Sequence, residues 1–316
     1  MSIYVICPHA DVPFGGVRKA YLHVDFLNSG GFDAFIVHAK PGFRCTWFEN
    51  QTKIRYWGGL KLTNSDILVV PPIPPSVIQL APGVRKVILN QAPYWTFEGA
   101  SFENEDKPNA CIHDEVMATL VISNDGFNYL RFAFPRARII QFRQGVDISI
   151  FKYVSAKKRQ IAFMPRRPFF LRQVINMLKA RGTLEDFNLV PIAGSTEKEV
   201  AQIMGESCIF LAGSTHEGFG LPAAEAMACG CAVVGYHAGG GKEFLLPEFA
   251  FPVATGEVVA FVKAVEDVIH LSSGKPEELE SKTKLAASFI ASNYSLTQER
   301  ETLLAAWQQI LDGGLA

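Results

Sequence analysis

The chain has 316 residues, of which 48% are hydrophobic and 19% are charged, and its formal net charge at pH 7 is −1. This length suits two domains of roughly 150 residues each, and the near-neutral charge argues against a nucleic-acid binder. No stretch approaches the ~20 consecutive apolar residues of a membrane span, and the N-terminus runs into a strand without a signal-peptide pattern. The six cysteines are scattered, which predicts reduced core thiols in a cytoplasmic protein.

The first half of the chain predicts a doubly wound α/β sheet. Residues 3–7 form a strand, Gly15 and Gly16 end the loop that follows, an amphipathic helix comes next, and residues 32–37 form a second strand. This order opens a doubly wound sheet, whose ligands bind at the carboxyl ends of its strands. Further strands are predicted at residues 67–70, 86–89, 119–123 and 139–142, with a helix at residues 126–134.

Residues 41–64 are aromatic and irregular in pattern, and include Trp47, Tyr56 and Trp57. Two interpretations stand side by side. The segment is an insertion that lines an acceptor site, or it is a small satellite of the core beneath a loop.

The second half restarts the alternation of strand and helix. Strands are predicted at residues 160–164, 187–192, 208–211 and 231–235, and helices at residues 169–180, 196–204, 256–271, 277–292 and 296–311. The run from Gly239 to Lys242 superficially suggests a phosphate loop, but its glycine spacing is wrong and Glu243 replaces the required Ser or Thr.

The most informative stretch joins a strand to a helix through a glycine-rich loop. Gly218 and Gly220 allow close backbone approach, and Pro222 suits the first turn of a helix. The helix dipole accounts for a carboxylate at Glu225 but leaves Glu217 unexplained. Free N–H groups and two carboxylates in one pocket suit a ligand that is anionic at one end and rich in hydroxyls at the other, such as a sugar nucleotide.

This stretch, Glu-Gly-Phe-Gly-Leu-Pro-Ala-Ala-Glu from Glu217 to Glu225, resembles the E-x7-E signature of retaining glycosyltransferases of the GT-B fold, family 4 type. The resemblance implies that Glu217 is catalytic and faces the transferred sugar, and that Glu225 binds the ribose hydroxyls of the donor. It also implies that the loop between them binds the donor through Gly218, Phe219, Gly220 and Leu221.

The same resemblance implies an α/β protein of GT-B architecture, with two Rossmann-like doubly wound domains facing a central cleft. Residues 1–150 are then the acceptor-side domain, residues 151–295 the nucleotide-sugar-binding domain, and residues 296–316 a helix that returns to the first domain. The stretch from Gln144 to Phe151 resembles the N-G-V-D-x-x-x-F motif that closes the first domain, with Gln144 in place of asparagine. Gly16 corresponds to the donor-binding glycine loop. Asn90 and Gln91 stand where many relatives carry a histidine that faces the reactive centre.

Eleven Lys and Arg residues lie between Arg131 and Arg172, with Asp147 the only acidic residue among them. We interpret Lys157-Lys158-Arg159 as a solvated basic face. The family places an arginine and a lysine on the donor diphosphate after the first strand of the second domain. Arg166 matches the arginine, Arg172 takes the place of the lysine, and Arg167 is a further donor-binding residue, so Arg166 and Arg172 are assigned to catalysis.

The sequence therefore predicts a retaining, metal-independent glycosyltransferase. Its donor is a nucleoside-diphosphate sugar, which is a substrate and not a cofactor, and its acceptor is a glycan, a lipid at a membrane or a small molecule. The expected location is the cytoplasm, with a peripheral position at the inner face of a membrane as an alternative. Two other functions stay open: a non-catalytic nucleotide-sugar-binding subunit, and an epimerase or phosphorylase on the same scaffold.

Overall fold

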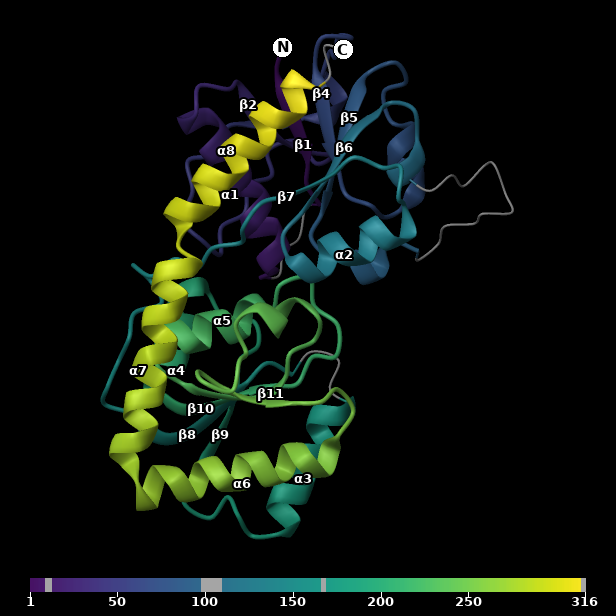
Figure 1. The fold of residues 1–316 in the computed structure, drawn as a ribbon. Helices are drawn as coiled ribbons and strands as arrows, with labels where there is room; N and C mark the ends of the chain where they lie inside the picture. The colour runs from purple at the N-terminus through teal and green to yellow at the C-terminus, as the bar shows by residue number, and fades with distance from the viewer. Residues whose placement is uncertain (9–12, 98–109, 166–168, 314–316) are drawn as a thin grey trace. The chain divides into compact units, whose positions relative to one another are not determined.

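The computed structural model describes residues 1–8, 13–97, 110–165 and 169–313. It divides into two compact units, drawn in Figure 1. The first unit comprises Met1–Arg143 and Glu299–Ala316, and the second comprises Gln144–Gln298. The sequence predicts the corresponding boundaries after residue 150 and at residue 296.

The first unit contains a parallel sheet whose strands lie in the order β3-β2-β1-β4-β5-β6-β7. Its described elements are β1 (Ile3–Ile6), α1 (Gly15–Ser29), β2 (Ala34–His38), β3 (Ile54–Tyr56), β4 (Ile67–Val70), β5 (Arg85–Asn90), β6 (Val116–Val121), α2 (Asn124–Ala133), β7 (Ile139–Gln141) and α8 (Leu296–Asp312). The central strands are continuous apolar runs, as expected where both faces of a parallel sheet are covered. The order reverses between β1 and β4, which makes this a doubly wound sheet.

Helix α8 packs along α1 although their contacting residues are some 280 positions apart in the sequence. Trp307 Nε1 donates a hydrogen bond to His23 Nε2 at 2.9 Å. Lys19 and Glu299 form an ion pair at 2.6 Å, with side chains only 4% and 3% exposed. On α8, Leu303, Trp307 and Ile310 are buried.

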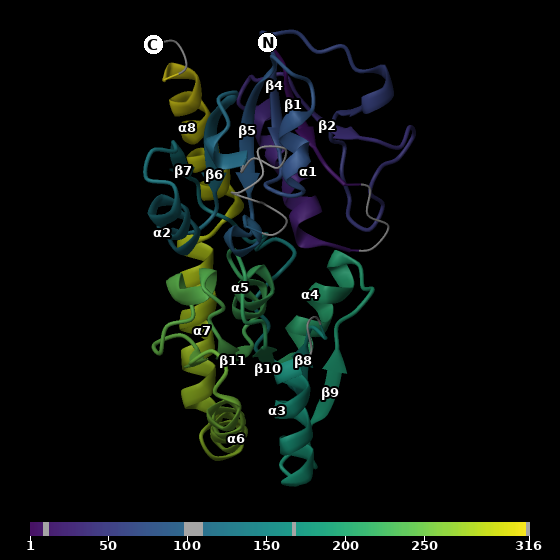
Figure 2. The ribbon, with the colours of Figure 1, turned by 90° about the vertical axis from the view of Figure 1, so that its right-hand side faces the viewer.

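The second unit contains a smaller parallel sheet in the order β12-β11-β10-β8-β9. Its described elements are β8 (Lys158–Phe163), α3 (Phe169–Ala180), β9 (Asn188–Pro191), α4 (Glu197–Glu206), β10 (Ser207–Ala212), α5 (Leu221–Ala228), β11 (Ala232–Tyr236), β12 (Phe251–Val253), α6 (Val258–Gly274) and α7 (Pro276–Asn293). Helices α3 and α6 cover one face of this sheet, and α4 and α5 cover the other, as Figures 1 and 2 show.

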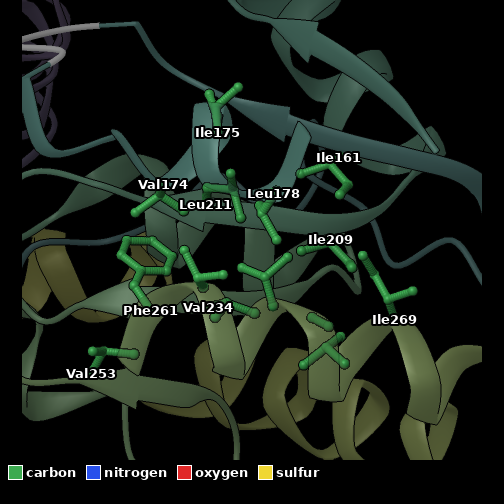
Figure 3. Close-up of a cluster of buried hydrophobic side chains, with 14 of the residues drawn as sticks. Ile161, Val174, Ile175, Leu178, Ile209, Leu211, Val234, Val253, Phe261 and Ile269 are labelled. Atoms are coloured by element: carbon green, nitrogen blue, oxygen red, sulfur yellow. The ribbon is translucent and has the colours of Figure 1, made fainter. Parts of the chain in front are cut away.

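The core of the second unit lies between the sheet and the pair α3 and α6. Figure 3 shows side chains from β8, β10 and β11 pointing toward those of the two helices, among them Ile161, Ile209, Leu211, Val234, Val174, Leu178 and Phe261. Each of these side chains is buried, and full burial of one such side chain stabilises a fold by roughly 1.5–3 kcal/mol. This packing holds the sheet rigid, so that its loops start from fixed positions.

Most elements agree with those predicted from the sequence, and the helix at residues 169–180 and the strand at residues 67–70 match exactly as α3 and β4. Two strands were missed, β3 and β12. Each has three residues and lies at the edge of its sheet, so each is too short for an alternating or continuous apolar pattern.

The interpretation of Lys157 as part of a solvated basic face was wrong. Lys157 Nζ donates to the carbonyl oxygens of Met204, Gly205 and Cys229, at 3.4, 2.9 and 2.7 Å. These carbonyls belong to the carboxyl ends of α4 and α5, which attract a cation. Burial lowers the pKa of this ammonium group.

Candidate active site

Three loops leave the carboxyl ends of neighbouring strands in the second unit. Strand β10 lies between β8 and β11, so the segments that follow these three strands start side by side. The strand order reverses between β8 and β10, and ligands of doubly wound sheets bind at the carboxyl ends beside this switch point. The stretch predicted as a site follows β10, and it therefore starts at this position.

The loop after β10, Gly213–Gly220, carries Glu217, and we call it the glutamate loop. Glu217 N donates to Ala238 O at 2.7 Å, and Gly240 N donates to Glu217 O at 3.1 Å. These two bonds form an isolated parallel bridge to the loop after β11. The backbone of Glu217 is thus fixed, while its side chain is half-buried and remains reachable.

Two glycines allow this arrangement. Gly220 has φ of 93°, a left-handed conformation that a side chain would strain, and it stands at the start of α5. Gly240 has no room for a side chain, because a Cβ atom there would lie 2.3 Å from Gly218 O and 2.5 Å from Phe219 Cα. The glycine run from Gly239 therefore packs against the glutamate loop, and Gly240–Glu243 forms a short 3-10 helix.

Helix α5 begins at Leu221, so Glu225 lies just beyond the first turn, and not within that turn as its position after the glycine loop predicts. Glu225 is 5% exposed. The stabilisation that a helix dipole gives to a carboxylate falls off within the first turn, so the dipole at the start of α5 does not by itself account for Glu225.

The amino end of α5 has no side-chain cap, since its N-cap residue is Gly220. In the described part of the chain, the amides of Gly218, Phe219 and Leu221 also donate no backbone hydrogen bond. Free amides at a helix start bind anions. An anionic group seated here would lie at the helix that also carries Glu225.

Of the three arginines predicted to bind the donor diphosphate, the structure describes only Arg172. Arg172 is exposed on the first turn of α3. Its neighbour Leu171 packs against Gly213, the first residue of the glutamate loop. The approach is close enough that a Cβ atom on Gly213 would lie only 2.9 Å from Leu171 Cβ. Arg166 and Arg167 lie outside the described residues.

In the first unit, Gly16 lies at the start of α1 and contacts Gln91. Gln91 Nε2 donates to Gly16 O at 3.2 Å. Asn90, by contrast, is fully buried, donates to Thr96 Oγ1 at 2.8 Å and accepts from the Ala92 amide at 3.1 Å. Asn90 thus closes a turn, and Gln91 is the residue of this pair that reaches the glycine loop.

Other candidate ligands form no metal centre within the described ranges, where no group of three or more His, Cys, Asp or Glu side chains converges. His216 is exposed, and its Nδ1 lies 3.1 Å from Thr215 Oγ1, a contact within the loop. Sequence reasoning missed Tyr294 and Phe244, whose rings contact that of Phe219. Neither residue lies in a recognisable pattern, so only the folded chain reveals them.

Comparisons with known proteins point to glycosyltransferases. Residues 173–286 match the family model Glycosyl transferases group 1, a range that includes the glutamate loop and α5. An alpha-1,6-glucosyltransferase of Actinobacillus pleuropneumoniae serotype 7 (strain AP76) is 25% identical over 185 residues, which are 56% of this chain and 54% of that relative. The match thus spans about half the length of the relative.

Solved structures resemble the chain over nearly its whole length. Sucrose-phosphate synthase from Thermosynechococcus elongatus has a TM-score of 0.71 at 13% identity, covering 98% of this chain and 99% of that one. Anabaena Alr3699/HepE, solved in complex with UDP and glucose, has a TM-score of 0.71 at 12% identity, covering 98% of this chain and 100% of that one. With its two parallel sheets, the chain has the GT-B fold of these glycosyltransferases.

Proposed function

We propose that this chain is a retaining, metal-independent glycosyltransferase that moves a sugar from a nucleoside-diphosphate sugar to an acceptor. The observation that carries the proposal is the position of Glu217, held by backbone pairing at the switch point beside the uncapped start of α5. The match of residues 173–286 to Glycosyl transferases group 1 supports it.

Each part of the site has a role in this reaction. The uncapped amides of α5 and the cations Arg166, Arg167 and Arg172 hold the donor diphosphate and stabilise its charge as the glycosidic bond breaks. Glu217 faces the sugar and stabilises the positive charge that develops on it. Glu225 accepts hydrogen bonds from the ribose hydroxyls. No resident cofactor is required, because the nucleotide sugar is itself a substrate.

We assign the donor side to the second unit and the acceptor side to the first, and Gly16 of the first unit, which Gln91 contacts, is a donor-binding residue. Residues 41–64 are a candidate acceptor surface, because part of the segment lines a pocket with Lys40, Phe43, Arg44 and Trp47. A glycan or a lipid headgroup suits such a mixture of cations and aromatic rings.

UDP-glucose is the first donor to test, because Anabaena HepE was solved with it and a glucosyltransferase is among the relatives. Transfer or slow hydrolysis of a panel of nucleotide sugars would be followed by NMR in buffer containing EDTA. We expect release of UDP, and a product with the anomeric configuration of the donor. Release that required added Mn²⁺ would contradict metal independence, and inversion would contradict the retaining mechanism.

The same experiment separates the alternatives. An epimerase changes the sugar without an acceptor, a phosphorylase needs inorganic phosphate, and a binding subunit protects the donor without cleaving it. Thermal stabilisation by UDP with no turnover of any donor would favour the binding subunit.

We also propose a peripheral position at the inner face of a membrane. No described helix combines the length and apolar character that crossing a bilayer requires. Phe132 on α2 is 92% exposed, however, and the adjoining Arg131 and Arg136 are exposed as well. An exposed aromatic ring between arginines suits an anionic lipid surface. The six free cysteines fit a reducing compartment.

A further inference from the structure

Phe219 stands between two glycines of the glutamate loop, yet it is only 3% exposed. Its ring contacts those of Phe244 and Tyr294, with centroids 5.0 and 5.4 Å apart. Because the glycines on either side have no side chains, Phe219 is the anchor that fixes this part of the loop. Tyr294 and Phe244 are the two aromatic residues that pack against the Phe219 ring.

The hydroxyl of Tyr294 contacts Glu243, which belongs to the 3-10 turn that pairs with the glutamate loop. It donates to the main-chain oxygen and to Oε2 of Glu243, each at 3.4 Å. Glu243 ends the short 3-10 turn Gly240–Glu243, whose first amide donates to Glu217 O. Tyr294 therefore contacts the glutamate loop directly, through its ring on Phe219. Through its hydroxyl it also contacts Glu243, in the 3-10 turn that pairs with this loop.

The backbone of Tyr294 lies where the chain leaves the second unit, between α7 and α8. Its carbonyl oxygen accepts a hydrogen bond of 2.7 Å from Val146 N, and Val146 forms a parallel bridge with Ser295. Val146 itself follows the point at which the chain enters the second unit, after Arg143. The segment at Val146, where the chain enters the second unit, is therefore hydrogen-bonded to the segment at Tyr294, where the chain leaves it. The ring of Tyr294 is also the one that contacts Phe219 of the glutamate loop.

We infer that Tyr294 is a positioning residue, which holds Glu217 in its productive geometry and links that geometry to the paired connections at Val146 and Ser295. The inference rests on the proposed function, since it takes Glu217 as the residue beside the reacting sugar. Tyr294 acts through Phe219 and Glu243. A small displacement of Glu217 lowers the rate of transfer, whereas the Leu221 amide at the start of α5 and the proposed cations keep their hold on the diphosphate.

The test compares Tyr294→Leu and Tyr294→Phe with Phe187→Leu as the matched control. Phe187 is a buried ring of the same unit, but it precedes β9 and so lies at the amino ends of the parallel strands, whereas the glutamate loop follows their carboxyl ends. Tyr294→Leu is expected to lower kcat about a hundredfold, because misplacement by about 1 Å has that effect. UDP affinity, measured by calorimetry, should stay within about threefold. Tyr294→Phe keeps the ring and should recover kcat to within about threefold of wild type, since only a long hydrogen bond is lost.

A second measurement does not depend on activity. Hydrogen exchange of the peptide that spans residues 213–220 should speed up in Tyr294→Leu and stay unchanged in Phe187→Leu, although both variants lower the melting temperature. If kcat and the exchange of this peptide are the same in the two variants, or if UDP affinity falls as much as kcat, the inference is wrong. A wild-type chain without turnover would overturn the proposed function instead, and the exchange comparison would still decide the role of Tyr294.

Discussion

Glu217 and Glu225 belong to one segment, but the structure gives them different surroundings. Glu225 is buried within α5, whereas Glu217 is half-buried in a loop whose backbone pairs with the loop after β11. A residue that holds an unchanging part of the donor contributes equally to the ground state and the transition state. A residue beside the developing charge contributes mainly to the transition state.

Kinetics of two variants should separate these roles. Glu225→Gln is expected to raise the donor KM with little change in kcat, the mark of lost uniform binding. Glu217→Gln should lower kcat about a hundredfold, equivalent to about 3 kcal/mol. Steady-state kinetics with UDP-glucose measures both. A kcat within twofold of wild type for Glu217→Gln, together with its loss in Glu225→Gln, would reverse the two assignments.

Gly240 offers a test of the close approach between two loops. In Gly240→Ala the new Cβ would meet backbone atoms of Gly218 and Phe219, which cannot yield as a flexible side chain does. Overpacking of this kind costs about 1–3 kcal/mol, and the shift of the glutamate loop should abolish most transfer. Gly241→Ala is the matched control, because its nearest contact is Leu245 Cδ1 at 3.2 Å, which can move. Equal activity in both variants would show that the close approach is unimportant.

At the scale of elements, one lysine joins two helices. Lys157 donates to carbonyls at the ends of α4 and α5, so Lys157→Met leaves these acceptors without their charged donor. We expect a loss of about 2 kcal/mol in the free energy of unfolding, measured in urea. Lys158→Met removes the exposed ion pair with Glu206 and should cost less than about 1 kcal/mol. Similar losses in the two variants would contradict the capping role of Lys157.

The contact between α1 and α8 should make stability depend on pH. Burial lowers the pKa of His23 from 6.5 to about 3, and its Nε2 must stay unprotonated to accept from Trp307. In the unfolded chain this histidine binds a proton near its ordinary pKa, so stability falls as pH drops from 6.5 toward 3.

His23→Gln keeps an acceptor for Trp307 but does not titrate. Between about pH 7 and about pH 5, the wild type should therefore lose about 2 kcal/mol more than this variant in urea unfolding. The comparison cancels the titration of all other groups. Parallel losses in the two proteins would mean that His23 is protonated in the fold.

At the scale of the whole molecule, we expect selective binding to anionic vesicles through Phe132, Arg131 and Arg136. Each arginine near such a surface contributes about 1 kcal/mol, so the double change to glutamine should weaken partitioning about 30-fold. Phe132→Ser should weaken it as well. Val259→Ser, at another exposed apolar residue, is the control. Co-sedimentation with phosphatidylglycerol vesicles measures the effect, and equal binding to neutral phosphatidylcholine would rule out the charge-based mechanism.

The sequence by itself determined the fold class and singled out the stretch from Glu217 to Glu225 as the candidate site. Strands such as β4 are uninterrupted apolar runs, helices such as α3 show their period, and glycine and proline punctuate the loop before α5. These signals are local, because they arise from backbone sterics and from the repeat of each element. The stretch from Glu217 to Glu225 was recognisable for the same reason.

Tertiary structure alone decided which polar residues are buried and what holds the site in place. The Lys19–Glu299 pair, the capping by Lys157 and the support of Phe219 by Tyr294 join residues that are remote in the sequence. A charged or aromatic residue on a helix face has the same local pattern whether solvent or another element covers it. Its energy is set by desolvation and by the partner that folding brings to it, and neither quantity is contained in the neighbouring residues.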